Sequence, residues 1–300
     1  RYSSLYRLDQ LADWGINSER ELGILPSVDA YNRVMDIHNS YDSRQTDNTH
    51  TLGAFLVWNK KTTKSEWWAQ LVPNLSLLSR TMHYHSGNVD TTFTKRSILY
   101  NMYSTFIKWR STDHKYEFML QYHVNGQAPD MNLFVNILNT TDPLNVTMGN
   151  TNLKPSYKHE LISHFLRIYP KKGLMWLIEA QYIPTVNAIA MGYTYDKATG
   201  KRTFRPDNVN GNWHGQLALG GAGPLTKNRK LDFKAMAGLR YEKSVDLIGL
   251  AGTSASNRSI VESLNYIGDL QLNYRLGQSS IGFISKGNWA HVDGSREDFE

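Results

Sequence analysis

The sequence predicts an all-β fold, an antiparallel up-and-down transmembrane β-barrel, from three observations. Segments in which apolar and polar residues alternate recur from residue 49 to the end of the chain. The connections between these segments are short and long in turn. Tyr and Trp are abundant, at 17 and 8 residues, and both favour strands and membrane interfaces. These features are typical of a barrel in an outer membrane.

The composition excludes several classes of protein. The net charge is +6, and the densest basic stretch, KNRKLDFK at 227–234, indicates a solvated turn, so no nucleic-acid partner is expected. The absence of Cys excludes disulfides, thiolate metal sites and a cysteine nucleophile. No apolar run approaches the ~20 residues that a membrane helix needs. Any crossing of a membrane would therefore be made by strands.

Residues 1–48 are expected to form a segment of loops and short helices at the barrel rim. Helical spacing is shared by Leu5, Leu8, Leu11 and Ala12. Gly15 would end this first helix. Ser27 can cap a second one, VDAYNRVMDIH, and the polar stretch that follows indicates a surface loop.

Residues 49–300 are expected to be part of the barrel, with about ten strands, many of roughly 9–14 residues. The segment HKYEFMLQYHVNG (114–126) is representative, because its apolar and polar residues would lie on opposite faces of a strand. Similar stripes run through 174–182, 231–241 and 264–274, and several begin or end on Tyr or Trp, as an aromatic girdle requires. A soluble sandwich would bury the apolar face, whereas a membrane barrel turns it toward lipid.

The connections favour the membrane barrel. Short ones are expected near 59–64, 110–113, 170–173, 222–228 and 276–280, and long polar ones at 81–94, 125–156, 184–211 and 243–258. This is the arrangement of short periplasmic turns and long extracellular loops. A sandwich has no reason to keep it through successive hairpins.

The segment NGQAPDMNLFVNILNTTDPLNVTMGNTNLKPSYKHELISHF (125–165) carries a motif. It resembles the barrel region of TonB-dependent outer-membrane receptors, where Ala-Pro-x-x-x-Leu is followed by Gly-Asn-Pro-Asn-Leu-Lys-Pro-Glu. The matching residues are Ala128, Pro129, Leu133, Gly149, Asn150, Asn152, Leu153, Lys154 and Pro155. Thr151 and Ser156 depart from the pattern, at the places of Pro and Glu. The segment is most similar to the barrels of the Bacteroidota, a Gram-negative group.

We interpret the motif as architectural. Pro155 favours an extended residue before it and has no N–H to give to a ladder, so it suits the start of a strand. Gly149 and Asn150 would allow a tight bend that returns the loop to the rim. A ligand contact is the alternative role.

The resemblance implies a barrel of about 22 strands with an N-terminal plug. This chain is then a partial barrel, without its plug domain and C-terminal strands. The implied location is the cell outer membrane. The implied partners are its lipid, the plug domain and the TonB system, and a surface lipoprotein is a further candidate partner. The implied function is uptake of an extracellular nutrient, such as an iron chelate, a cofactor, a glycan or a peptide, and no bound cofactor is expected.

Two alternative functions stay open. One is a non-transporting outer-membrane barrel that serves as a surface or secretion scaffold, which would lack a plug and a TonB box. The other is a soluble carbohydrate-binding β-sandwich, which would fold without detergent. An enzyme is not expected, because the chain has no Gly-x-Ser-x-Gly nucleophile elbow. Its GGAGPLTKN segment (220–228) lacks the Gly-Lys-Ser/Thr ending of a phosphate loop.

The polar strand positions are the candidates for lining the lumen, and each would more often hydrate the wall than bind a ligand. They are Lys115, Glu117, Gln121, Glu179, Gln181, Lys234, Arg240, Gln271, Asn273 and Arg275. His83 and His85 are weak metal candidates, since they would share one strand face. They have no identifiable third ligand, so no metal site is predicted.

Overall fold

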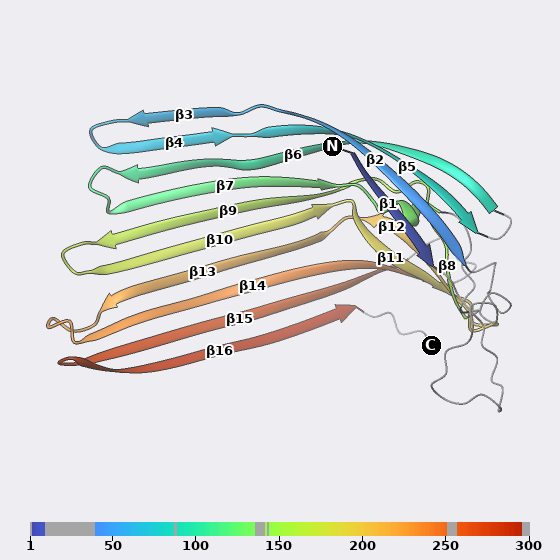
Figure 1. Cartoon of the computed structure of the whole chain (residues 1–300). Helices are drawn as coiled ribbons and strands as arrows, with labels where there is room; N and C mark the ends of the chain where they lie inside the picture. The colour runs from blue at the N-terminus through green and yellow to red at the C-terminus, as the bar shows by residue number, and fades with distance from the viewer. Residues whose placement is uncertain are drawn as a thin grey trace.

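The computed structural model describes residues 2–9, 40–86, 89–135, 142, 144–250 and 257–295. These residues form one 16-stranded sheet, in which most neighbouring strands are antiparallel (Figure 1). Within the described part, no helix has the length and apolar character needed to cross a membrane. The all-β, antiparallel fold class is confirmed.

The strands follow one another along the chain with one short 3₁₀ helix, η1, at Met131–Phe134. They are β1 (Tyr2–Asp9), β2 (Tyr41–Gly53), β3 (Leu56–Lys61), β4 (Ser65–Leu71), β5 (Pro73–Ser86), β6 (Val89–Ser111), β7 (Tyr116–Gln127), β8 (Asn145–Thr147), β9 (Ser156–Tyr169), β10 (Leu174–Val186), β11 (Ala188–Tyr195), β12 (Arg202–Val209), β13 (Asn212–Pro224), β14 (Leu231–Leu250), β15 (Asn257–Leu276) and β16 (Ser279–Ser295). The count exceeds the ten predicted partly because bends divide long strands. Asn187, with φ of 53°, separates β10 from β11.

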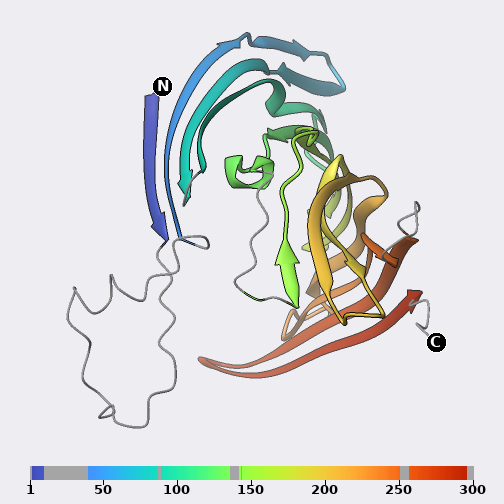
Figure 2. The same cartoon turned by 90° about the vertical axis from the view of Figure 1, so that its right-hand side faces the viewer.

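The sheet is an open arc, and the described strands do not close it into a barrel (Figure 2). Among the described strands, β16 pairs with β15 alone, and β3 pairs with β4 alone. η1 and β8 lie on the concave side of the arc, and β11 and β12 fold over its end (Figure 2). β11 pairs in parallel with β14, and β12 pairs in parallel with β8.

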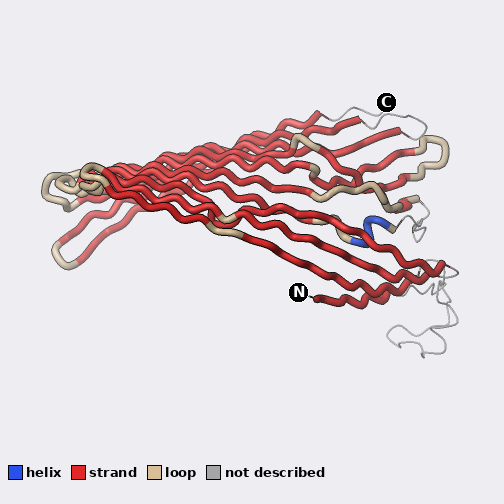
Figure 3. Tube along the Cα trace, turned by 90° about the horizontal axis from the view of Figure 1, so that it is seen from above, coloured by secondary structure: helices blue, strands red, loops and turns tan. Residues whose placement is uncertain are grey.

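The five short turns lie together at one end of the sheet (Figures 1 and 3). They join β3 to β4, β6 to β7, β9 to β10, β13 to β14, and β15 to β16, as the sequence predicts. At the other end, the prediction of a loop at 81–94 is wrong. The strands β5 and β6 stay paired there, from the partners Thr81 and Thr94 to the partners Ser86 and Val89. The polar residues there lie in paired strands rather than in irregular backbone.

The first strands also differ from the prediction. Tyr2–Asp9, with Leu5 and Leu8, is a strand rather than a helix, because the edge of β2 supplies its backbone hydrogen-bond partners. This pairing overrides the weak helical spacing. β2 begins at Tyr41, ahead of residue 49. Residues 10–39, including the helix expected after Ser27, lie outside the described part.

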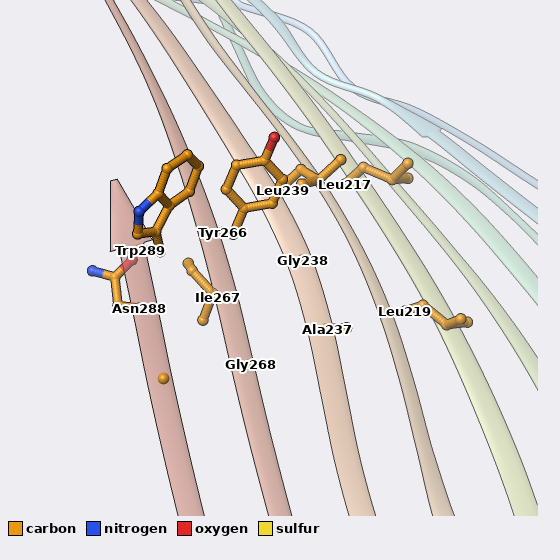
Figure 4. Close-up of a pocket in the computed structure, with 11 residues that line it drawn as sticks. Leu217, Leu219, Ala237, Gly238, Leu239, Tyr266, Ile267, Gly268, Asn288 and Trp289 are labelled. Carbon is orange, nitrogen blue, oxygen red and sulfur yellow. The ribbon is translucent and has the colours of Figure 1, made fainter. Parts of the chain in front are cut away.

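The convex face of the sheet is apolar and uncovered. The register aligns Phe118, Phe165, Ile178 and Leu219 across four neighbouring strands, with exposed fractions between 36% and 50%. A hollow of about 620 Å³ is lined on this face by Leu217, Leu239, Tyr266 and Trp289, with the small residues Ala237 and Gly268 between them (Figure 4). No second sheet packs on these side chains in the described part of the chain.

Aromatic rings cluster toward both ends of the apolar face. At the end away from the turns, Trp213 lies 5.5 Å from Tyr182 and 4.6 Å from Tyr241 between ring centroids. Near the turns, Trp176 contacts Phe233 at 6.1 Å. Such belts place amphipathic rings at the two membrane–water interfaces. The apolar band between them therefore has the layout of a lipid-facing surface.

Candidate functional site on the concave face

The concave face carries the polar half of each alternating strand. The ten lumen-lining candidates fall on one side of the sheet by register and sequence parity, opposite the apolar stripe. One cross-strand row runs from Gln121 through Gln181 and Gln216 to Arg240. Another aligns Lys234 with Gln271, and a third aligns Asn273 with Asp232.

Many of these side chains pair across strands. Lys108 contacts Glu117 at 2.8 Å, and the Gln181 amide donates to Glu160 at 2.9 Å. His164 lies 3.3 Å from Glu179, and the Arg240 guanidinium donates to Gln216 at 3.1 Å. Arg275 pairs with Asp232, while Lys115 turns back to Asp113 in the adjoining turn. Neighbouring strands thus join their polar side chains by ion pairs and hydrogen bonds and form a polar wall.

The first half of the receptor-like motif, residues 128–133, is held by hydrogen bonds from β5 and from the second half of the motif. Ala128 directly follows β7, and the Pro129 carbonyl accepts a 2.6 Å hydrogen bond from the Arg80 guanidinium. Arg80 is only 7% exposed and lies on β5. The Leu133 carbonyl then accepts from the Asn150 backbone N–H at 2.7 Å, which joins the two halves of the motif.

The second half of the motif is tied to β12. Asn150 is 3% exposed, donates to the Pro206 carbonyl at 3.0 Å and accepts from the Asn152 N–H at 2.9 Å. The Lys154 N–H donates to Asn208 at 2.7 Å, and Asn208 donates back to the Lys154 carbonyl at 3.0 Å. Leu153 joins the core cluster around η1, and Pro155 stands immediately before β9.

Gly149 is required for a reason other than the one expected from the sequence. It is not among the described glycines that have positive φ, so a tight bend does not explain it. A Cβ at this position would lie 2.2 Å from the Val135 carbonyl oxygen and 2.9 Å from that of Leu133. The glycine therefore allows two backbone segments to approach closely.

Burial perturbs two groups on the part of β5 beyond the aromatic belts. Desolvation lowers the pKa of Arg80, and the charges of Asp47 and Asp130 act in the opposite direction. Burial likewise raises the pKa of the Tyr84 phenol. Arg80 remains charged at any ordinary pH. It therefore acts as a permanent buried donor for the segment that carries the motif, residues 128–155, which we call the motif loop.

Replacing Arg80 should loosen the motif loop. In Arg80→Met the apolar stem is kept but the buried Pro129 carbonyl loses its charged donor, which we expect to cost about 1.5–3 kcal/mol. Limited proteolysis of the reconstituted protein should then cut the 128–155 segment faster. Arg96→Met is the matched control, because Arg96 is exposed on the opposite face of β6. Equal cleavage of the two variants would contradict the anchoring role.

A cavity of about 190 Å³ lies between the motif loop and the strands around it. Its lining comes from β2, β5, η1, β8, β11 and β12, and comprises Tyr41, Tyr84, Asn132, Leu133, Val135, Thr147, Met148, Gly149, Met191 and Pro206. Leu133 and Gly149 are motif residues, but the others were missed by sequence reasoning. No local pattern joins positions that are so far apart in the chain.

The two histidines that flank Tyr84 lie on the opposite face of β5 from it. His83 and His85 are exposed on the outer side of β5, and His83 shares a 2.7 Å hydrogen bond with Thr92. Tyr84 between them is buried on the inner side. Within the described residues, no group of three or more His, Cys, Asp or Glu side chains is placed to hold a metal ion.

The apolar convex face, the polar concave face, the aromatic belts and the turns gathered at one end define an outer-membrane β-barrel protein. Residues 104–291 match the outer membrane protein beta-barrel family, and the chain belongs to that family. The location is therefore the cell outer membrane, with its lipid around the convex face. Barrels of this family are typically not enzymes. No curated protein matches the sequence.

Among solved structures, the chain is similar to the siderophore receptor PirA from Pseudomonas aeruginosa. The identity is 11% and the TM-score 0.37, over 85% of this chain and 59% of the receptor. The chain thus spans less than two thirds of that receptor's length.

Proposed function

We propose that the chain forms part of a TonB-dependent transporter barrel, which takes up an extracellular nutrient such as an iron chelate, a cofactor, a glycan or a peptide. The observation that carries this proposal is the receptor-like motif of Ala128–Pro155. Its two halves are hydrogen-bonded to each other, and also to β5 and β12. The motif segment is architectural in this proposal, and it shapes the extracellular mouth.

The open arc supports a large barrel. Unpaired strand edges are not tolerated in the hydrocarbon region, so the edges of β3 and β16 that no described strand covers need further strands. A barrel with more strands than this arc encloses a wide lumen, which transporters fill with a plug. Residues 49–300 are then part of the barrel wall, and 1–48 contribute to its rim, with β1 and the start of β2 as strands.

The polar concave face supports a hydrated path. The ten candidates from Lys115 to Arg275 would line the lumen or contact the plug domain. The TonB system would then be the energy-coupling partner on the periplasmic side, and a surface lipoprotein would be an extracellular partner. A bacterium of the Bacteroidota type would be the natural host.

Energy-dependent uptake tests the proposal. Cells with the intact gene and cells with the gene deleted are given radioiron chelates, radiolabelled cobalamin, labelled oligosaccharides and labelled peptides. We expect one class to accumulate only in cells with the gene, and a protonophore to abolish the accumulation. If no class is taken up above the deletion strain, while surface proteins are lost from the deletion strain, the scaffold alternative replaces the transporter.

A further inference from the structure

The cavity beneath the motif loop has the character of a small binding site. Two aromatic rings, Tyr41 and Tyr84, stack at its wall with centroids 5.2 Å apart and planes at 22°. Met148, Met191 and Pro206 add further apolar surface from β11, β12 and the segment after β8. Flat aromatic faces and adaptable thioethers together favour a ring that can lie against them.

The size of the cavity limits what it can hold. Pockets for whole drug-sized ligands measure about 300–1,000 Å³. The 190 Å³ here is smaller, so the cavity can take a single ring-sized group rather than a whole extended molecule. The remainder of a larger ligand would stay outside the cavity.

The charge of the cavity limits the ligand further. None of the described side chains that line it is ionisable except for its two tyrosines. An anion or a cation in such a site would lose its hydration without gaining a counter-charge, which is costly. The group that enters should therefore be neutral.

One polar atom at the site lacks a partner. Asn132 lines the cavity, and its side-chain Oδ1 is buried with no hydrogen bond within the described structure. The Asn132 backbone is already satisfied, since its N–H donates to Asp130 and its carbonyl accepts from Val135. An orphan buried acceptor costs free energy until a donor reaches it. A hydroxyl on the bound ring would supply that donor.

We propose that this cavity binds a neutral, hydroxylated ring, which stacks against the Tyr41–Tyr84 wall and donates its hydroxyl to Asn132. A phenolic ring and a pyranose sugar both carry this chemistry. For its physiological meaning the inference rests on the proposed transport function, since it then names the part of the nutrient that is recognised. The binding itself needs neither energy coupling nor a plug.

Equilibrium binding to the full-length protein in nanodiscs tests the inference, with saturation-transfer NMR as the readout. The probes are phenol, methyl glucopyranoside, anisole as the ring without a donor, and benzoate as the charged ring. We expect phenol or the glucoside to bind at least about tenfold more tightly than anisole or benzoate. The stronger of the two hydroxylated probes identifies the source of the ring.

Two variants locate the site. Met191→Trp fills the cavity and should abolish binding, whereas Met175→Trp, at the turn end of β10, should leave it unchanged. Asn132→Leu should bring the affinity for phenol or glucoside down to that for anisole. Circular dichroism and heat-dependent gel mobility confirm that each variant is folded.

The outcomes separate this inference from the transport proposal. If Met191→Trp binds as well as the parent protein, or if anisole binds as tightly as both hydroxylated probes, the cavity is not the site proposed. Hydroxylated-ring binding without energy-dependent uptake would uphold the cavity and overturn transport. Uptake without such binding would do the reverse.

Discussion

An arginine at Leu217 is expected to destabilise the membrane-inserted protein by about 2–4 kcal/mol. Leu217 lies on the convex side of β13, is 53% exposed and is flanked in register by Ala180 and Leu239. A guanidinium at this position would have to enter hydrocarbon or distort the bilayer to reach water. Urea unfolding of the full-length protein in lipid vesicles measures the loss.

Ile267→Arg is the matched control for that substitution. Ile267 lies on β15 on the opposite, concave face, where its register neighbours are Gly238 and Asn288. The same change of an apolar residue to Arg should cost less than about 1 kcal/mol there, because the side chain reaches water and a polar wall. A larger loss at Ile267 than at Leu217 would reverse the assignment of the two faces.

Gly149→Ala is the second substitution from which we expect a large effect. The new Cβ would meet two backbone carbonyls, which cannot swing away as a side chain could. Overpacking of this kind costs about 1–3 kcal/mol or more and should separate the second half of the motif, residues 149–155, from η1. Hydrogen exchange should show faster exchange of the Asn150 N–H, which donates to the Leu133 carbonyl.

The control for Gly149 is Gly287→Ala on β16. A Cβ at Gly287 would meet nothing within 4 Å, and its φ is not positive. This variant should match the parent protein in both stability and exchange. If Gly149→Ala also behaves like the parent, the close approach of the two backbone segments does not hold the loop.

The sequence predicts the membrane part of the fold well, for a clear physical reason. Lipid on one side and water on the other force a two-residue period, which can be read directly from residues such as Leu217 and Gln216. The short turns can be predicted equally well, because Gly and polar residues interrupt the two-residue period of the strands. The polar residues proposed for the lumen fall on one face for the same reason.

The region beyond the membrane is predicted less well, because no lipid layer imposes an apolar stripe on the outer face of its strands. The hairpin of β11 and β12 lies in this region, where polar composition led to the expectation of a loop at 184–211. The cavity is harder still. Tyr41, Asn132 and Met191 meet only because parallel pairings with β8 and β14 fold the hairpin back. Such long-range pairing leaves no local signature.

The central claim is that the stripe on each strand faces acyl chains while the alternate residues face water. The chain has no Cys, so a single cysteine can be placed in turn at residues 216 to 219 of β13 and spin-labelled in the vesicle-reconstituted, full-length protein. The account predicts that labels at Leu217 and Leu219 collide preferentially with lipid-soluble oxygen. Labels at Gln216 and Ala218 should collide instead with a water-soluble nickel chelate. Equal accessibility at all four positions, or the opposite alternation, would contradict it.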